Sequence, residues 1–400
     1  MSTLAIDGGA AVRTSPLPPW PCFQDDEIGA VTAVLRSGKV NYWTGNEGRA
    51  FETEYAAAVG TRHAVAVANG TVSLEALLAV YGIGAGHEVI TTPRTFMASA
   101  SAAVMRGATP VFADVDRDSQ NITAESIERV ITPATRAIIV VHLAGWPCEM
   151  DAIMDLARAH DLVVIEDCAQ AHGATYRGRQ VGSLAHGGSF SFCQDKILTT
   201  GGEGGMITID DDERWRAAWA LKDHGKSYEA CFEREHPPGY RWLIESFGTN
   251  WRLTEMQAAI GRSILRKLPD WHAARTRNAM QLVDALSHVA GLRVPVPPAH
   301  MAHAWYKFYA FVEPGALAHG WSRDRVMEAV AAEGIPCYSG SCSEIYLEKA
   351  FDGARPARRL PMARELGETS LMFLVHPTLT EQEMADTVAA VTKVMAAAVR

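Results

Sequence analysis

The stretch AIIVVHLAGWPCEMDAIMDLARAHDLVVIED, which occupies residues 137–167, indicates the fold of this chain. Its apolar runs at residues 137–142 and 162–165 lie on either side of an Ala- and Leu-containing segment at residues 150–160. Continuous apolar strands with helices between them are typical of a parallel sheet that is covered on both faces. The stretch therefore predicts a strand, a helix and a second strand of such a sheet.

The same alternation extends outward over the first two thirds of the chain. It predicts helices at residues 72–81 and 98–106 and further strands at residues 64–68, 88–92, 111–113, 189–192 and 206–209. The last two of these strands have no helix between them, and we expect them to form a separate element with an antiparallel edge. The predicted class is α/β, with a mostly parallel central sheet.

The pattern changes after residue 205. A helix is predicted at residues 254–268, since Thr254 and Gln257 form a capping box at its start, and Pro269 should end or kink it. A second helix should follow at about residues 271–289. Beyond it we expect a strand at residues 307–312, a helix at 323–333, an irregular stretch at 334–362 and a closing helix from about 381. These elements predict a large domain at residues 1–265, with an N-terminal arm, and a smaller α+β domain at residues 266–400.

Composition restricts the class of protein. The 400 residues exceed one small domain, because domains average roughly 150 residues. Hydrophobic residues make up 48% and charged residues 21%, which are values of globular chains rather than disordered ones. The net charge is 37 − 46 = −9. An acidic chain is poorly suited to follow a phosphate backbone, so a general nucleic-acid binder is excluded.

Targeting signals and cysteine spacing point to the cytoplasm. No apolar run approaches the roughly 18 residues that cross a bilayer, so no membrane partner is expected. The N-terminus has no basic segment followed by an apolar one, as a signal peptide would. The seven cysteines are scattered without a C-x-x-C pair, which favours reduced thiols. No H-E-x-x-H motif or paired ligand spacing supports a metal site.

Three polar features lie at the ends of predicted strands, where open α/β sheets bind their ligands. Asp167 directly follows one strand, and Lys196 follows another, ahead of the glycine-rich residues 201–205. Asn69-Gly70-Thr71 joins a strand to a helix, whose N-terminus favours an anion. Each feature also has a structural interpretation: a turn or helix cap for Asp167, a solvated lysine before a turn for Lys196, and a helix cap for Thr71.

Taken together, the three features suggest pyridoxal 5′-phosphate (PLP) as a cofactor. Its phosphate requires an anion site such as a helix N-terminus. Its pyridine nitrogen requires a carboxylate, which keeps it protonated, and its aldehyde requires a lysine with which to form a Schiff base.

The chain resembles the DegT/DnrJ/StrS family of PLP-dependent sugar aminotransferases, which belong to the fold-type I (aspartate-aminotransferase-like) enzymes. The resemblance extends from about Trp20 to the C-terminus. Its motifs, in matching order and spacing, are residues 69–71, 92–96, 110–116, 164–170, Ser191-Phe192 with Lys196, 202–205 and 248–252. It implies a three-layer αβα fold with a smaller C-terminal domain.

The resemblance also implies roles for individual residues. Lys196 matches the Schiff-base lysine, and Asp167 matches the acid that pairs with the pyridine nitrogen. Gln170 matches the residue that bonds the ring's phenolic oxygen, and Phe96 matches the aromatic residue that stacks on the ring, although a core position is the alternative for Phe96. The phosphate ligands implied are Gly70, Thr71, Ser191 and, from the other subunit of a homodimer with a shared active site, Asn250.

The activity that the resemblance implies is transamination by a ping-pong mechanism. Glutamate or glutamine would give its amino group to the cofactor, and a nucleotide-linked keto-sugar would receive it. Members that dehydrate or deoxygenate sugars lack the lysine, so Lys196 favours transamination. Tyr42, Trp43 and Tyr338 match segments near the substrate in relatives, with packing of an N-terminal arm as the alternative for Tyr42 and Trp43.

Two departures from the family pattern leave the acceptor open. Asn69 stands where the phosphate loop often begins with Ser, and residues 337–342 (CYSGSC) replace a His-Tyr-Pro-like run. A keto-cyclitol or aminoshikimate-type precursor is therefore an alternative acceptor, and a PLP-binding regulatory protein is an alternative of another class. A nicotinamide dehydrogenase would need G-x-G-x-x-G after the first strand, and residues 68–76 contain none.

Overall fold

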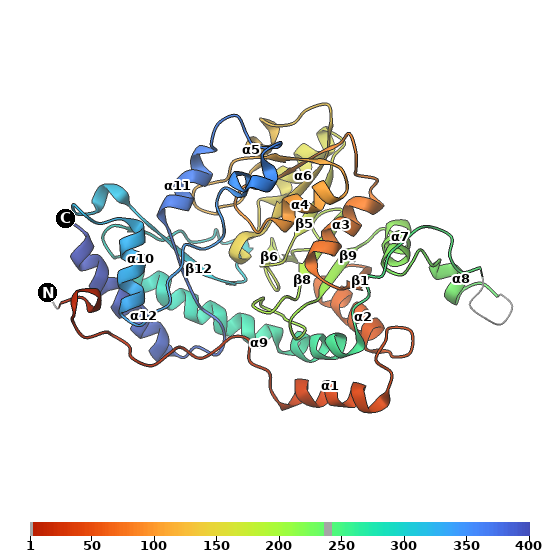
Figure 1. Ribbon diagram of the computed structural model, residues 1–400, viewed down its shortest axis with the longest axis horizontal. Helices are drawn as coiled ribbons and strands as arrows, with labels where there is room; N and C mark the ends of the chain where they lie inside the picture. Colours follow the sequence, from red (N-terminus) through yellow and green to blue (C-terminus); the bar gives the residue numbers. More distant parts are fainter. Residues whose placement is uncertain (1–2, 236–241) are drawn as a thin grey trace.

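The computed structural model describes residues 3–235 and 242–400 and shows a central sheet flanked by helices (Figure 1). The sheet has seven strands in the order β1-β9-β8-β5-β4-β2-β3. The strands are β1 (His63–Val67), β2 (Glu88–Thr91), β3 (Thr109–Phe112), β4 (Thr135–Val141), β5 (Val163–Asp167), β8 (Gly187–Ser191) and β9 (Gly205–Ile209). Neighbours from β3 to β8 pair in parallel, and only the pairs that contain β9 are antiparallel. The predicted mostly parallel sheet is confirmed.

The prediction of a separate element at residues 189–192 and 206–209 is wrong. The strands at these residues, β8 and β9, do pair antiparallel, but both lie inside the main sheet. Antiparallel neighbours need no crossover helix, so the glycine-rich connection between them suffices. The free edge of β9 is then covered by β1, which pairs Val67 with Gly205. Sheet membership is a long-range property that the local pattern did not reveal.

Helices cover both faces of the sheet. Because side chains alternate along a strand, Val65 of β1 packs with Leu77 of α3, whereas the next residue, Ala66, packs with Phe51 of α2. Helices α4 and α7 lie on the α3 face, while α6 and α9 lie on the α2 face. The helices are α2 (Glu47–Val59), α3 (Gly70–Val80), α4 (Ala98–Met105), α6 (Met150–Ala159), α7 (Asp212–Lys222) and α9 (Glu255–Leu286). The predicted three layers are confirmed.

Helix α9 is continuous, which corrects the prediction of two helices separated at Pro269. The predicted capping box is present, since Thr254 N–H donates to Gln257 Oε1 at 3.0 Å and Gln257 N–H donates back to Thr254 Oγ1. The first half of α9 packs on α1 (Asp25–Ser37) and α2, and its second half packs on α12 (Glu381–Ala398). Packing on both sides offsets the hydrogen bond that proline removes. The proposed domain boundary at 265/266 falls inside this helix and stays a prediction.

The C-terminal part has its own core around an antiparallel sheet in the order β10-β12-β13. Leu4, from the start of the chain, is buried in this core beside α12, and both termini lie at the left of Figure 1. The predicted elements at residues 307–312, 323–333 and from 381 are confirmed, whereas α11 and β13 were not predicted. The elements are β10 (Leu292–Arg293), β12 (Phe308–Val312), α10 (Arg323–Ala332), α11 (Pro361–Thr369) and β13 (Ser370–Phe373).

The remaining α-helices and strands of the described chain are short. They are α5 (Ala124–Glu128), α8 (Tyr228–Phe232) and a small sheet of β6 (Thr175–Tyr176), β7 (Arg179–Gln180) and β11 (Met301–Ala302). All seven cysteines are free, as the sequence predicts. Among the described helices, none has the length and apolarity that a bilayer crossing needs.

Three buried histidines make the stability of the fold depend on pH. Burial lowers the pKa of His172, His303 and His376 to about 3. Below the ordinary pKa of about 6.5, the unfolded chain takes up protons that the folded chain does not. Each histidine therefore reduces the free energy of unfolding by up to about 1.4 kcal/mol per pH unit as the pH falls from about 6.5 towards 3.

The substitution His303→Asn should remove one of these contributions. His303 Nδ1 accepts the N–H of Trp305 at 2.7 Å, and an asparagine oxygen can accept from the residue two positions on. We expect the variant to be less stable at pH 7.5 but to lose about 1.4 kcal/mol less per pH unit below about pH 6. Denaturant unfolding at a series of pH values checks this, and parallel pH profiles for the variant and the parent would contradict it.

Candidate active site

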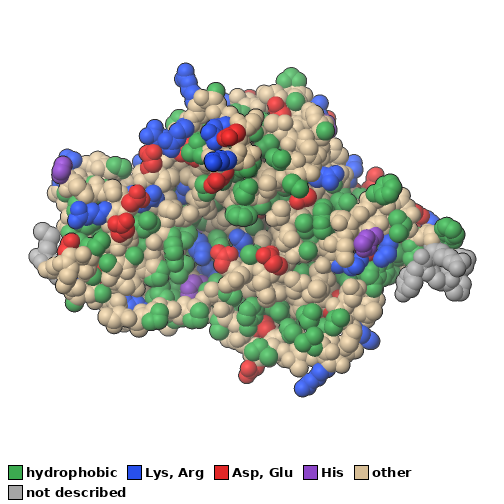
Figure 2. Space-filling view, in the orientation of Figure 1, with side chains coloured by type: hydrophobic (Ala, Val, Ile, Leu, Met, Phe, Trp, Pro, Cys, Tyr) green, Lys and Arg blue, Asp and Glu red, His purple; other side chains and the backbone are tan. Residues whose placement is uncertain are grey.

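A cavity of about 970 Å³ lies at the carboxyl ends of the parallel strands, between the sheet and the C-terminal part. In the space-filling view, basic and acidic side chains meet in the middle of the molecule (Figure 2). The cavity brings together eight of the predicted site residues, which are Gly70, Thr71, Phe96, Asp167, Gln170, Ser191, Lys196 and Tyr338.

One end of the cavity is an anion cradle at the start of α3. Asn69 caps this helix, because its Oδ1 accepts the N–H of Val72 at 3.0 Å. The first N–H groups of the helix, at Gly70 and Thr71, have no partner within it. A Cβ atom on residue 70 would lie 2.6 Å from the Cβ of Ser191, so only glycine permits the backbone to approach the end of β8 this closely. The geometry fits a phosphate group.

A buried carboxylate also lines the cavity. Asp167 is the last residue of β5; its Oδ2 accepts a hydrogen bond from Ser99 Oγ at 2.7 Å, and its Oδ1 accepts the N–H of Ala169 at 3.1 Å. Burial raises the pKa of Asp167, and the two hydrogen bonds oppose this effect. A carboxylate buried in this way is stabilised by a cationic group such as a protonated pyridine nitrogen. Ser99, which the sequence did not single out, positions this acid.

Gln170 and Phe96 line the same cavity. Gln170 accepts the N–H of Ala144 with its Oε1 at 2.8 Å, so its NH₂ group is the part that can donate to a ligand. Phe96 is 68% exposed although it follows a buried strand, which excludes the alternative of a core position. An exposed aromatic ring on a cavity wall offers a stacking surface for a flat ligand.

Lys196 lies in the loop after β8, and tertiary contacts hold its backbone. Its N–H donates to Cys193 O at 3.1 Å, and its carbonyl accepts from Trp20 Nε1 at 3.1 Å. The Nζ atom lies 5.1 Å from the centre of the Tyr306 ring and 4.0 Å from Asp195 Oδ1. The backbone of Lys196 is therefore held in place, and its amine has a nearby counter-ion in Asp195.

Three neighbours of Lys196 were not predicted. Tyr306 donates its hydroxyl hydrogen to Asp195, and Lys307 Nζ lies 4.0 Å from the same carboxylate. The sequence carries a signal for Lys307, because a lysine inside the aromatic run of residues 305–311 is a charge among apolar side chains. Asp195 is adjacent to Lys196 in the sequence, but its other two partners, Tyr306 and Lys307, are more than a hundred positions away.

Tyr42, Trp43 and Asn250 do not line this cavity within the chain. Tyr42 is buried and donates to Glu52 Oε2 at 2.9 Å. Within one chain it therefore has the packing role that was the alternative to a position near the substrate. Trp43 donates from Nε1 to Asp223 Oδ2 at 2.7 Å, and Asn250 forms a backbone bridge with the same Asp223. Trp43 and Asn250 thus both contact Asp223, which does not line the cavity, and the roles of all three predicted residues toward cofactor or substrate stay predictions.

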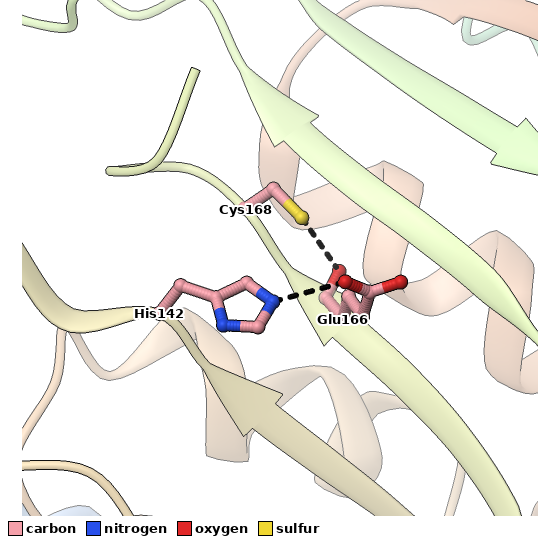
Figure 3. Close-up of side chains that lie close together, drawn as sticks. All are labelled: His142, Glu166 and Cys168. Carbon is pink, nitrogen blue, oxygen red and sulfur yellow. Dashed lines mark hydrogen bonds and ion pairs between the residues drawn. The ribbon is translucent and has the colours of Figure 1, made fainter. Parts of the chain in front are cut away.

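His142, Glu166 and Cys168 form a buried group next to Asp167 (Figure 3). Glu166 accepts hydrogen bonds from the N–H groups of residues 182, 184 and 185 at 2.7–3.0 Å, in addition to His142 Nε2 at 3.0 Å. His142 Nδ1 accepts the N–H of Cys148, and burial raises the pKa of the Cys168 thiol. These bonds use the lone pairs that a metal would need. Through Glu166, the group instead ties β5 to the loop that follows β7.

A model of the DegT/DnrJ/EryC1/StrS aminotransferase family matches residues 21–392. The chain belongs to this family. An aminotransferase from Psychrobacter cryohalolentis, whose X-ray structure is known, is 58% identical with a TM-score of 0.94 over 96% of this chain and 99% of that one. The predicted family, the type I fold and the classification as an aminotransferase are confirmed.

Two further relatives show the range of reactions around this chain. The L-glutamine:2-deoxy-scyllo-inosose aminotransferase of Streptomyces kanamyceticus is 38% identical over 346 residues, which cover 84% of this chain and 79% of that protein. The GDP-perosamine synthase of Caulobacter vibrioides is 36% identical over 362 residues, which cover 88% of this chain and 92% of that protein.

Glu166→Gln should destabilise the fold. A carboxamide replaces one acceptor oxygen by an NH₂ group. This NH₂ group would face backbone N–H donors, and neither donor would have an acceptor. We expect a loss of about 2–4 kcal/mol in the free energy of unfolding, measured by denaturant titration. The control Glu128→Gln makes the same change at an exposed position of α5 and should leave stability within about 0.5 kcal/mol. Equal unfolding midpoints for the two variants would contradict the structural role of Glu166.

Proposed function

We propose that this aminotransferase uses PLP to move an amino group from glutamine or glutamate to a nucleotide-linked keto-sugar in a ping-pong reaction. The observation that carries the proposal is that Lys196, Asp167 and the N-terminus of α3 border one cavity. An amine, a buried acid and an anion cradle are the three groups that this cofactor requires.

The residues that line the cavity would each have a separate role toward the cofactor. When bound, PLP supplies an aldehyde that carries the amino group and a ring that withdraws electrons. Gly70, Thr71 and Ser191 would hold the phosphate, and Phe96 would cover the ring face. Asp167, held by Ser99, would keep the ring nitrogen protonated. Lys196 would supply the amine that anchors the cofactor, and the same amine is the group that could move a proton at the reacting carbon.

The acceptor is the least constrained part of the proposal. The cavity volume of about 970 Å³ is large enough for a sugar with a further group attached. A relative named GDP-perosamine synthase supports a nucleotide-linked acceptor, and a relative named for a scyllo-inosose supports a cyclitol as the second candidate. Both names fit a polyhydroxylated ring, and one of them names L-glutamine as the amino donor.

The active site is proposed to be shared between the two subunits of a homodimer. Asn250 lies outside the cavity of its own chain, on a segment whose side chains Trp242, Ile244 and Phe247 are 82%, 62% and 103% exposed. Apolar side chains gathered at the surface in this way mark an interaction site. A partner that covers them would receive Asn250 next to its own cavity.

We also place the protein in the cytoplasm, because its cysteines are free.

The visible spectrum of the purified protein tests the cofactor and the donor. We expect an absorption band from the cofactor linked to Lys196, and its replacement by the band of the aminated cofactor when glutamine or glutamate is added. Lys196→Ala should still bind PLP through the phosphate cradle and Phe96, but lose at least about 10²-fold in turnover. The absence of any band after PLP is added, or retained turnover in the variant, would refute the proposal.

Mixed dimers test the shared site. A chain with Lys196→Ala and a chain with Asn250→Ala each form defective homodimers. In a mixed dimer, one cavity would combine an intact Lys196 with an intact Asn250. Random 1:1 mixing should therefore restore about a quarter of the parent activity at limiting PLP. Activity no higher than the average of the two variants would show that each chain builds its site alone.

A further inference from the structure

A second cavity, of about 390 Å³, adjoins the active-site cavity. We call it the side chamber; its outer wall is the N-terminal segment at residues 16–20, and it contains Arg275, Lys307 and His376. Asp195, Tyr306 and Lys307 line both cavities, so the side chamber opens next to Lys196. A ligand that reaches Lys196 can therefore extend into it.

The side chamber has more positive than negative charge. Lys196 Nζ and Lys307 Nζ each lie 4.0 Å from an oxygen of Asp195, so two amines share one carboxylate. Arg275 is 1% exposed and donates from Nη1 to the carbonyls of Trp305 and Tyr306 at 3.3 Å. Its Nε and Nη2 atoms have no hydrogen-bond partner among the described residues.

The other titratable groups do not balance this charge. His376 is neutral, because burial, Arg275 and Lys307 together lower its pKa to about 3. Burial also lowers the pKa of Lys307 to about 8 and that of Arg275 to about 9, which are the shifts of cations that lack sufficient counter-charge. Buried charges of this kind are costly unless they are paired. An incoming anion would complete the pairing.

We infer that the side chamber binds the carboxylate group of the amino-acid donor, with Lys307 as its contact and Arg275 as the charge behind it. The inference rests on the proposed transamination and adds the residue that recognises the donor. The volumes favour this assignment, since a carboxylate fits the smaller chamber, whereas the sugar that binds in the other half of the ping-pong reaction needs the larger cavity. The diphosphate of a nucleotide-linked acceptor is the other anion that could enter.

Calorimetric binding of glutarate to the PLP-loaded protein tests the inference without turnover, because glutarate is a dicarboxylate without an amino group. Lys307→Met should weaken binding at least about tenfold, since it removes a charged partner. Lys307→Arg keeps the charge and should bind glutarate within about threefold of the parent. The control Lys39→Met removes the same charge from an exposed lysine and should change nothing. Asp195→Asn removes the competing carboxylate and should tighten binding.

The outcomes separate the possible ligands and the two proposals. Glutarate binding that is absent in the parent, or equal in the parent and Lys307→Met, overturns the inference. So does a result in which Lys307→Met weakens the binding of inorganic pyrophosphate but not of glutarate, because the chamber would then serve the acceptor. If glutarate binding depends on Lys307 while glutamine and glutamate leave the parent's spectrum unchanged, the carboxylate site stands and the proposed transamination fails.

Discussion

The hydrogen bond from Ser99 to Asp167 is the contact on which the proposed chemistry of the cavity depends. A carboxylate at the end of a buried strand tends to become protonated, and it can then no longer stabilise a positive charge beside it. Ser99 and the N–H of Ala169 keep both oxygens of Asp167 in acceptor positions. The preceding residue, Glu166, points to the other face of the sheet and binds backbone N–H groups there. Two adjacent acids thus have different surroundings: Asp167 lines the cavity, whereas Glu166 is bonded to backbone on the other face of the sheet.

The cavity is lined by polar groups of both signs. Asp167 and the N-terminus of α3 together suit a molecule that carries one cationic and one anionic group. Lys196 lines the same cavity, and its counter-ion Asp195 is shared with Tyr306 and Lys307. The same carboxylate therefore connects the amine of Lys196 to the excess of cations in the side chamber. The fold holds all of these groups in place before any ligand binds.

The sequence predicted the parts of this site that follow from local rules. Asp167, Lys196 and Gly70 each follow a strand, and the ends of parallel strands meet at one edge of a sheet. Ser99, Tyr306 and Lys307 could not be placed in this way, because their contacts join residues distant in sequence. For the same reason the helix break at Pro269 was predicted wrongly, since packing along both halves of α9 outweighs the local preference of proline.

The burial of Leu4 in the C-terminal core has a consequence for synthesis on the ribosome. The side chain of Glu333 accepts hydrogen bonds from the N–H groups of Ala5 and Val12, so this segment binds to residues that are made more than three hundred positions later. Residues 4–12 therefore lack these partners while the intervening chain is synthesised. Their docking is a late step of folding, and until then the nascent segment is accessible to chaperones and proteases.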